Sequence, residues 1–196
     1  MQKSGLMPDQ FTFGSIIRSC SSLSSIELGR QLHVHVIKSE FGSHVIAQNA
    51  LIAMYTKFGQ IADALDVFSG IKKKDFIPWN AIISGFAYGG DANKAMLFFS
   101  QMRHLALTPD DITVRSLLCA CTSPVTLNQG MQIQPYLIKV GFDLGIAVCN
   151  TLLSMYAKCS DLYDTFKMLN EMTSNADSFY YSHQMLLSNK PPNSIM

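Results

Sequence analysis

Two runs of apolar residues with helical spacing, separated by a short break, lie between residues 45 and 75. The apolar residues of the first run are Leu51, Ile52 and Tyr55. Gly59 follows this run and is typical of a helix end, since glycine readily adopts the left-handed conformation needed there. The second run starts after Gln60, and its apolar residues are Ile61, Leu65 and Phe68. This pattern predicts a helix, a tight turn and a second helix.

The next segment, from Phe76 to Asp110, repeats this organisation. The apolar residues of its first run are Ala81, Ile82, Ile83 and Phe86. Gly89 and Gly90 interrupt the run, and Asp91 is well placed to cap a second helix. The apolar residues of the second run are Ala95, Phe98, Phe99 and Met102. We expect Pro109 to end this second helix, because proline cannot continue the backbone hydrogen bonds.

The chain also resembles itself at a fixed offset of 101 residues. The string NALI at Asn49 recurs as NTLL at Asn150, and QLHVHVIKSEF from Gln31 recurs as QIQPYLIKVGF from Gln132. A third copy, NAII, begins at Asn80, so one long period holds units of about 35, 31 and 35 residues. A single helix pair cannot cover its own apolar face, whereas stacked pairs can. Because no alternating strand pattern of useful length accompanies the repeats, the predicted fold class is all-α.

Composition narrows the possible functions. The net charge of +1 provides no global basic field, which counts against strong non-specific binding to nucleic acid but leaves a local groove possible. No apolar run is long enough to span a membrane, and the first residues lead into no signal-peptide core. We interpret the five cysteines, which lack zinc spacing, as small buried residues of a reducing compartment: Cys20, Cys119, Cys121, Cys149 and Cys159. His33 and His35 lie on different helix faces, so packing or surface roles are favoured over metal binding.

Several strings in this array resemble the pentatricopeptide repeat. FIPWNAIISGFA, from Phe76, is similar to the opening VVSWNAMISGYA of a standard repeat, and CNTLLSMYAK, from Cys149, resembles the short variant. The segment from Gln31 resembles the second helix of the long variant, and the segments ending at Asp9 and Asp110 resemble the G-x-x-P-D repeat ending. A tetratricopeptide repeat array is the main alternative family, because its unit is also a helix pair of similar length, but its Trp-Leu-Gly-Tyr signature is missing here. The resemblance implies a right-handed superhelical solenoid of helix-turn-helix repeats, of the plant-type subclass that alternates three repeat lengths.

The predicted array occupies residues 1–187, and a disordered tail follows at residues 188–196. The expected units are a partial repeat 1–9, long 10–44, short 45–75, standard 76–110, long 111–145, short 146–177 and partial 178–187. The chain begins inside a second helix and its last copy loses the pattern. We therefore expect a fragment or a truncated gene product.

By resemblance, each repeat binds one base of single-stranded RNA. The fifth residue of a repeat and its final residue read the base, while the second residue packs on the base face. Three pairs combine an amide with a carboxylate and imply a preference for uracil: Asn49 with Asp75, Asn80 with Asp110, and Asn150 with Asp177. The expected second-position residues are Phe11, Ile46, Ile77, Ile112, Ala147 and Phe179, and the fifth residue of the last copy is Ser182.

Some of these residues have other interpretations. An asparagine near a helix start can be a simple N-cap, although three asparagines at matching repeat positions favour base recognition. Arg115, at the fifth position of a long unit, is a cation expected to contact phosphate. The run Lys72-Lys73-Lys74 is either a solvated loop or a further phosphate contact.

No enzyme is visible in the sequence. The His-x-Glu and Pro-Cys-x-x-Cys segments of a cytidine deaminase are missing, and so are phosphate-binding glycine loops and nucleophile elbows. We expect no cofactor. The sequence predicts the recognition subunit of organellar RNA processing or C-to-U editing, in the mitochondrion or alternatively the chloroplast, with an editing deaminase or accessory factor acting in trans. The alternatives are a protein-interaction scaffold and a truncated product without function.

Overall fold

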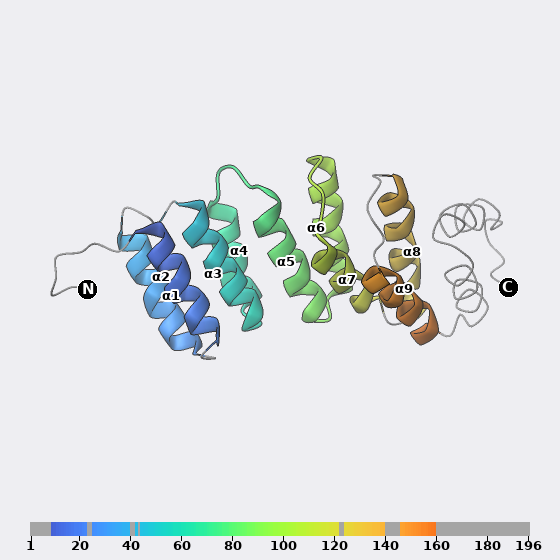
Figure 1. The fold of residues 1–196 in the computed structure, drawn as a ribbon, viewed down its shortest axis with the longest axis horizontal. Helices are drawn as coiled ribbons and strands as arrows, with labels where there is room; N and C mark the ends of the chain where they lie inside the picture. Colours follow the sequence, from blue (N-terminus) through green and yellow to red (C-terminus); the bar gives the residue numbers. More distant parts are fainter. Residues whose placement is uncertain are drawn as a thin grey trace. The chain divides into compact units, whose positions relative to one another are not determined.

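The computed structural model describes residues 9–22, 25–39, 42, 44–121, 124–139 and 146–159, and the regular structure of this part is α-helical (Figure 1). The chain divides into two compact units, residues 1–116 and 117–196, with the boundary inside one helix. None of the helices in the described ranges has the length and apolar character that crossing a membrane requires.

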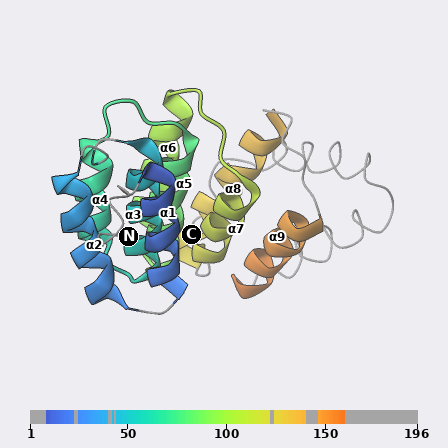
Figure 2. The same cartoon turned by 60° about the vertical axis from the view of Figure 1, so that its left-hand side comes forward.

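The first unit consists of three helix pairs and the start of a seventh helix. Its helices are α1 (Gln10–Ser22), α2 (Ile26–Lys38), α3 (Val45–Lys57), α4 (Ile61–Gly70), α5 (Phe76–Tyr88), α6 (Ala92–His104) and the first residues of α7 (Asp111–Ala120). The first helices of successive pairs stack on one another, so that α3 packs against both α1 and α5. The second helices α2 and α4 lie together on one side of α1 and α3 (Figure 2).

The odd-numbered helices begin at the first residues of the predicted units. Three of them are preceded by an aspartate whose side chain caps the helix. Asp9 Oδ1 accepts a hydrogen bond from the Thr12 backbone N–H at 2.8 Å, and Asp110 Oδ1 accepts one from Thr113 N–H at 2.8 Å. Asp75 Oδ1 accepts from the N–H of Ile77 at 3.0 Å. Each carboxylate therefore satisfies a backbone donor that the helix itself leaves free.

Three turns of the first unit share one geometry. Gly59 and Gly90 have φ angles of 69° and 79°, and the residue after each glycine donates its N–H to a carbonyl five residues back. Ala106 takes the same role at the end of α6, with φ of 55°, although alanine is strained there. The prediction that Pro109 ends α6 is therefore wrong. The helix ends at His104, because the turn at Ala106 already satisfies the last carbonyls.

The core of the first unit lies between the stacked helices. The largest fully buried side chains of α3 and α5 are Leu51, Ile52, Met54, Ile82 and Ile83. Burial of each such side chain contributes about 1.5–3 kcal/mol. Trp79 meets Phe68 edge to face with ring centroids 4.9 Å apart, and Phe98 lies 6.1 Å from Trp79. These aromatic contacts join α4, α5 and α6.

A polar cluster joins α2 to the next pair. His33 Nδ1 lies 2.9 Å from the Tyr55 hydroxyl. The pKa of His33 is lowered from its ordinary value, because the effect of burial outweighs the opposite effect of the Asp63 carboxylate. Arg30 forms an ion pair with Asp63 at 3.1 Å. The two histidines of the His33-x-His35 sequence thus differ, since His35 is exposed whereas His33 is an interhelical contact.

The second unit contains the end of α7, α8 (Pro124–Lys139) and α9 (Ile146–Lys158). Helix α8 packs against α9, and a Cβ placed on Gly130 would lie only 2.2 Å from the Met155 sulfur, so the two helices approach closely there. The Cys159 thiol donates to the Cys121 carbonyl at 3.6 Å, and burial raises the pKa of Cys121 to about 11. The prediction of buried cysteines is wrong for Cys119, which is exposed because its position on α7 points away from the core.

Candidate nucleic-acid interface

The three predicted asparagines occupy the same register in their helices. Asn49, Asn80 and Asn150 are the fifth residues of α3, α5 and α9. None of them is an N-cap, since α3 and α5 are preceded by His44 and Asp75 at that position. The alternative interpretation of these asparagines as caps is therefore wrong. Helix α5 is capped by the side chain of Asp75, and the N-cap residue of α3 is His44, whose side chain makes no cap hydrogen bond.

Asn80 is polar, buried and without a partner. Its side chain is 6% exposed, and neither Nδ2 nor Oδ1 has a hydrogen-bond partner within the described structure. Leaving a buried polar group unpaired costs about 1–3 kcal/mol, so such groups are rare and call for an explanation. An amide donates and accepts, which matches the mixed donors and acceptors on the edge of a base.

A pocket of about 480 Å³ lies beside this amide. It is lined by residues of α3, α5 and the start of α7, all within the first unit. The α3 residues are Ala53, Thr56 and Lys57; the α5 residues are Phe76, Ile77, Asn80, Ala81, Ser84, Gly85 and Tyr88; the remaining ones are Asp110, Ile112 and Thr113. The pocket thus brings together the predicted pair Asn80 and Asp110 with Ile77, which precedes Asn80 in α5. Its volume falls in the range of about 300–1,000 Å³ that is usual for ligand sites.

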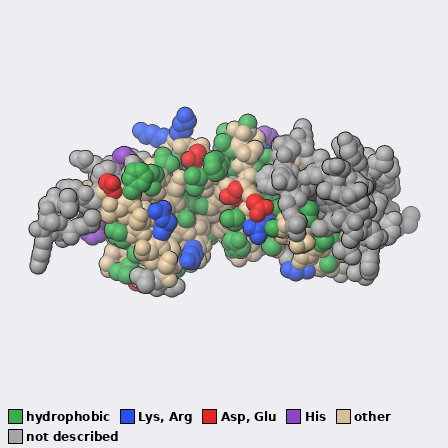
Figure 3. All heavy atoms as spheres, viewed as in Figure 1, with side chains coloured by type: hydrophobic (Ala, Val, Ile, Leu, Met, Phe, Trp, Pro, Cys, Tyr) green, Lys and Arg blue, Asp and Glu red, His purple; other side chains and the backbone are tan. Residues whose placement is uncertain are grey.

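Apolar side chains flank the polar ones in this pocket. Ile77 and Ile112 stand at the second positions of adjacent units and are 45% and 56% exposed. Exposure of large branched side chains at the rim of a pocket provides apolar surface for a flat ligand to cover. On the face drawn in Figure 3, hydrophobic side chains reach the surface among interspersed acidic and basic ones.

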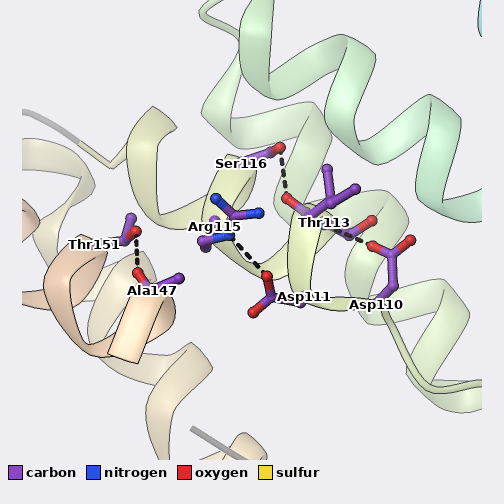
Figure 4. A network of polar contacts seen from close by, with 8 residues as sticks. Asp110, Asp111, Thr113, Arg115, Ser116, Ala147 and Thr151 are labelled. Atoms are coloured by element: carbon purple, nitrogen blue, oxygen red, sulfur yellow. Dashed lines mark hydrogen bonds and ion pairs between the residues drawn. The ribbon is translucent and has the colours of Figure 1, made fainter. Parts of the chain in front are cut away.

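Asp110 belongs to the pocket and to the helix cap at the same time. One carboxylate oxygen accepts from Thr113 N–H, as Figure 4 shows. A carboxylate offers about four lone-pair sites on its two oxygens, so capping leaves acceptor capacity for a ligand. The aspartate is exposed, which keeps that capacity accessible.

The described members of the other two predicted pairs do not line this pocket. Asn49 Oδ1 is buried without a partner, while Asp75 is exposed and caps α5. Ile46 is half-buried, and a Cβ on Gly14 would lie 3.2 Å from its Cγ2 atom. In the second unit Asn150 and Ala147 are both exposed. Three predicted site residues lie outside the described residues, Asp177, Phe179 and Ser182.

Two of the cations considered as phosphate contacts, Arg115 and Lys74, already have partners. Arg115 Nε lies 2.9 Å from Asp111 Oδ2, one helical turn earlier (Figure 4), so this cation is partly neutralised. In the lysine run, Lys74 Nζ donates to the Ile71 carbonyl at 2.6 Å and lies over the Phe68 ring. The neighbouring Lys72 and Lys73 are exposed.

Sequence reasoning missed most of the residues that line the pocket, among them Tyr88 and Thr113. Tyr88, at the end of α5, is 73% exposed and offers an aromatic face. Thr113 contributes a buried hydroxyl. The sequence did mark this position as a repeated one, because Thr12 lies 101 residues earlier, at the repeat offset. The repeat could not indicate a pocket at this position, because the pocket depends on how three helices stack.

This arrangement of stacked antiparallel helix pairs, with polar groups at one register of the first helices, defines a helical-repeat protein of the α-solenoid class. Two structures of maize PPR10 share the fold. One aligns at a TM-score of 0.67 and 23% identity, covering 88% of this chain and 25% of PPR10. PPR10 in complex with an 18-nt psaJ RNA element aligns at a TM-score of 0.69 and 17% identity, covering 93% of this chain and 27% of PPR10.

Sequence comparison identifies the family. The family described as PPR repeat matches residues 49–76, 77–105 and 147–175. Pentatricopeptide repeat-containing protein At3g53360, mitochondrial, of Arabidopsis thaliana is 36% identical over 91% of this chain and 36% of its own length. At1g15510, chloroplastic, of the same plant is 33% identical over 86% of the chain and 19% of its own length. The chain belongs to the pentatricopeptide repeat family, and it spans about a third or less of the length of these relatives.

Proposed function

We propose that this chain binds single-stranded RNA and recognises individual bases along its first helices. The observation that carries the proposal is the buried, unpartnered amide of Asn80 at the wall of a pocket with Asp110 and two exposed isoleucines. A base inserted there would be covered on its faces by Ile77 and Ile112. Its polar edge would satisfy the Asn80 amide and the free capacity of Asp110.

The preferred base of this unit is uracil. Uracil presents two carbonyl acceptors and one N–H donor on its edge. The Asp110 carboxylate accepts only, and so is matched to the N–H, directly or through water. The Asn80 amide can donate to a carbonyl. Asn49 with Asp75 would act in the same way in the preceding unit, as would Asn150 with Asp177 further along.

In the cell, this recognition would serve organellar RNA processing or C-to-U editing. The chain would act as the recognition subunit without catalysis, and an editing deaminase or accessory factor would act in trans. The names of the relatives support an organelle, since one is called mitochondrial and another chloroplastic. We place the chain in the mitochondrion, with the chloroplast as the alternative. The alternation of long, short and standard repeats, with the unit boundaries given above, is part of the same proposal.

One observation favours a second function, an interaction scaffold for a protein segment. The net charge is only +1, and Arg115 is paired with Asp111, so little free positive charge attracts a phosphate backbone. A scaffold would bury the exposed isoleucines against an apolar peptide. It would not depend on which amide or hydroxyl stands at residue 80.

Base preference separates the two functions. The unit 76–110 is grafted into a longer array of the same family, and binding is measured to RNAs that differ only at the aligned base. We expect the wild-type unit to prefer uracil and the Asn80→Ser unit to shift toward guanine, because a hydroxyl is shorter than an amide and leaves room for a purine. One good base contact is worth about 1–3 kcal/mol of discrimination. If both units rank the four bases identically, base recognition by Asn80 is wrong and the scaffold becomes the better proposal.

A further inference from the structure

Thr113 carries a second buried polar group in the same pocket. Its side chain is 0% exposed, and its Oγ1 atom has no hydrogen-bond partner within the described structure. Thr113 lines the pocket together with Asn80 and Asp110. A buried hydroxyl without a partner weakens the folded state, so an unpaired one at a pocket wall points to a ligand that completes it.

Thr12 is the equivalent threonine of α1, and its hydroxyl takes part in the helix cap. Thr12 stands at the same register in α1 and donates both its N–H and its hydroxyl to Asp9 Oδ1, at 2.8 and 2.7 Å. In α7 the backbone bond is kept, since Thr113 N–H donates to Asp110 Oδ1 at 2.8 Å (Figure 4). The Thr113 hydroxyl makes no such bond to Asp110. Capping therefore leaves this buried hydroxyl without a hydrogen-bond partner in the described structure.

We propose that the Thr113 hydroxyl is a specificity-determining contact, the third polar group that meets the edge of the base held by Asn80 and Asp110. This inference rests on the proposed RNA binding. It also assigns a base contact to the third residue of the following unit, so that two adjacent units share one base site.

The chemistry of the three groups is complementary. The Asp110 carboxylate only accepts hydrogen bonds, whereas the Asn80 amide both donates and accepts. The Thr113 hydroxyl adds one further donor from the α7 side of the pocket. With uracil, the N–H faces the carboxylate, and the two carbonyl oxygens are left for the amide and the hydroxyl. Loss of the hydroxyl leaves one carbonyl oxygen without its donor.

The test is a selection from a randomised single-stranded RNA pool by the full 196-residue chain. Base frequencies among the bound RNAs are compared for the wild type, Asn80→Ser and Thr113→Val. The Asn80→Ser variant marks the RNA position that the unit recognises. Valine has nearly the shape of threonine without the hydroxyl, so Thr113→Val preserves the pocket wall. We expect Thr113→Val to reduce the preference at this same position by about 3- to 10-fold, the range for one neutral hydrogen bond.

Thr12→Val is the matched control. It removes a hydroxyl at the same register that is bonded to Asp9, and we expect it to lower thermal stability without changing base frequencies at the position marked by Asn80→Ser. Thr113→Ser keeps the hydroxyl and should keep the preference. If Thr113→Val fails to fold, Thr113→Ala takes its place, and the preference should be lost with alanine and retained with serine.

The outcomes separate the two proposals. Unchanged base frequencies in a folded Thr113→Val, or a change at a different RNA position, overturn the role of Thr113 while leaving Asn80 as a reader. The role is also overturned if Thr113→Ser loses the preference as completely as the variants without a hydroxyl. If the wild-type chain selects no base at any position, the proposed RNA recognition itself fails.

Discussion

Replacement of Asn80 by alanine tests whether this residue serves binding or folding. Asn80 has two buried polar atoms without partners in the described structure. A residue kept for folding destabilises the protein when truncated, whereas a residue kept for binding at the expense of stability does the reverse. We therefore predict that Asn80→Ala raises the free energy of unfolding and abolishes base preference in its unit.

The magnitude follows from three terms. Release of two unpaired atoms contributes about 2 kcal/mol, at the lower end of roughly 1–3 kcal/mol for each group. Alanine also favours the interior of α5 over asparagine by about 0.5 kcal/mol. Loss of the packing of the removed atoms costs about 1 kcal/mol. The net expectation is a stabilisation of about 1–2 kcal/mol, or several degrees in Tm, since each kcal/mol shifts the Tm of a chain of this size by about 2–4 °C.

Urea unfolding followed by fluorescence suits this measurement. Trp79 is the single tryptophan of the chain and is buried beside Phe68 in the first unit. Asn49→Ala is the matched control, because Asn49 stands at the same register of α3 and has only one buried atom without a partner. We expect its stabilisation to be smaller. A loss of 1 kcal/mol or more in Asn80→Ala would refute the reasoning, because it would mean that the amide supports the fold.

Three further predictions concern the first unit. Asp110→Ala should lower the free energy of unfolding by about 1 kcal/mol through loss of the α7 cap, whereas Asp110→Asn should retain stability, as measured by the same urea titration. Ala106→Gly should raise the Tm in calorimetry by relieving the positive φ angle of 55°, a gain of about 1 kcal/mol, and an unchanged or lower Tm would contradict the strain. Because burial lowers the pKa of His33 below its ordinary 6.5, the unfolded chain binds the proton more readily. Stability should therefore be complete above pH 6.5 and fall as the pH drops toward the folded-state pKa, and His33→Gln should flatten this pH dependence whereas His35→Gln, at an exposed site, should not.

The helices of the first unit could be predicted because their signals are local. Gly59 and Gly90 occupy turns that require positive φ, and Asp91 caps α6 as expected, with its carboxylate accepting from Lys94 N–H at 3.0 Å. The end of α6 was missed because Ala106 occupies a turn position that glycine usually fills, and an alanine in the sequence does not indicate a turn. Proline at residue 109 was the stronger sequence signal, although the helix had already ended.

The candidate site could be predicted only in part. Register along the repeats was sufficient to place Asn80 and Asp110 as a pair, and the pocket brings them together. The ion pair of Arg115 with Asp111 follows from their spacing of one helical turn, but a competing role at phosphate was equally consistent with the sequence. The place of Thr113 and Tyr88 in the pocket depends on the stacking of α3, α5 and α7, which no local pattern specifies.

The central claim, that a base occupies the pocket beside Asn80, is tested most directly by photo-crosslinking. Single-stranded RNA containing 4-thiouridine is bound to the full chain and irradiated, and the crosslinked peptides are identified by mass spectrometry. We predict crosslinks to residues of the pocket in α5 and at the start of α7, above all at the exposed ring of Tyr88 and at Ile112. Crosslinks confined to α4, α6 and the exposed Lys72 and Lys73 would contradict the account.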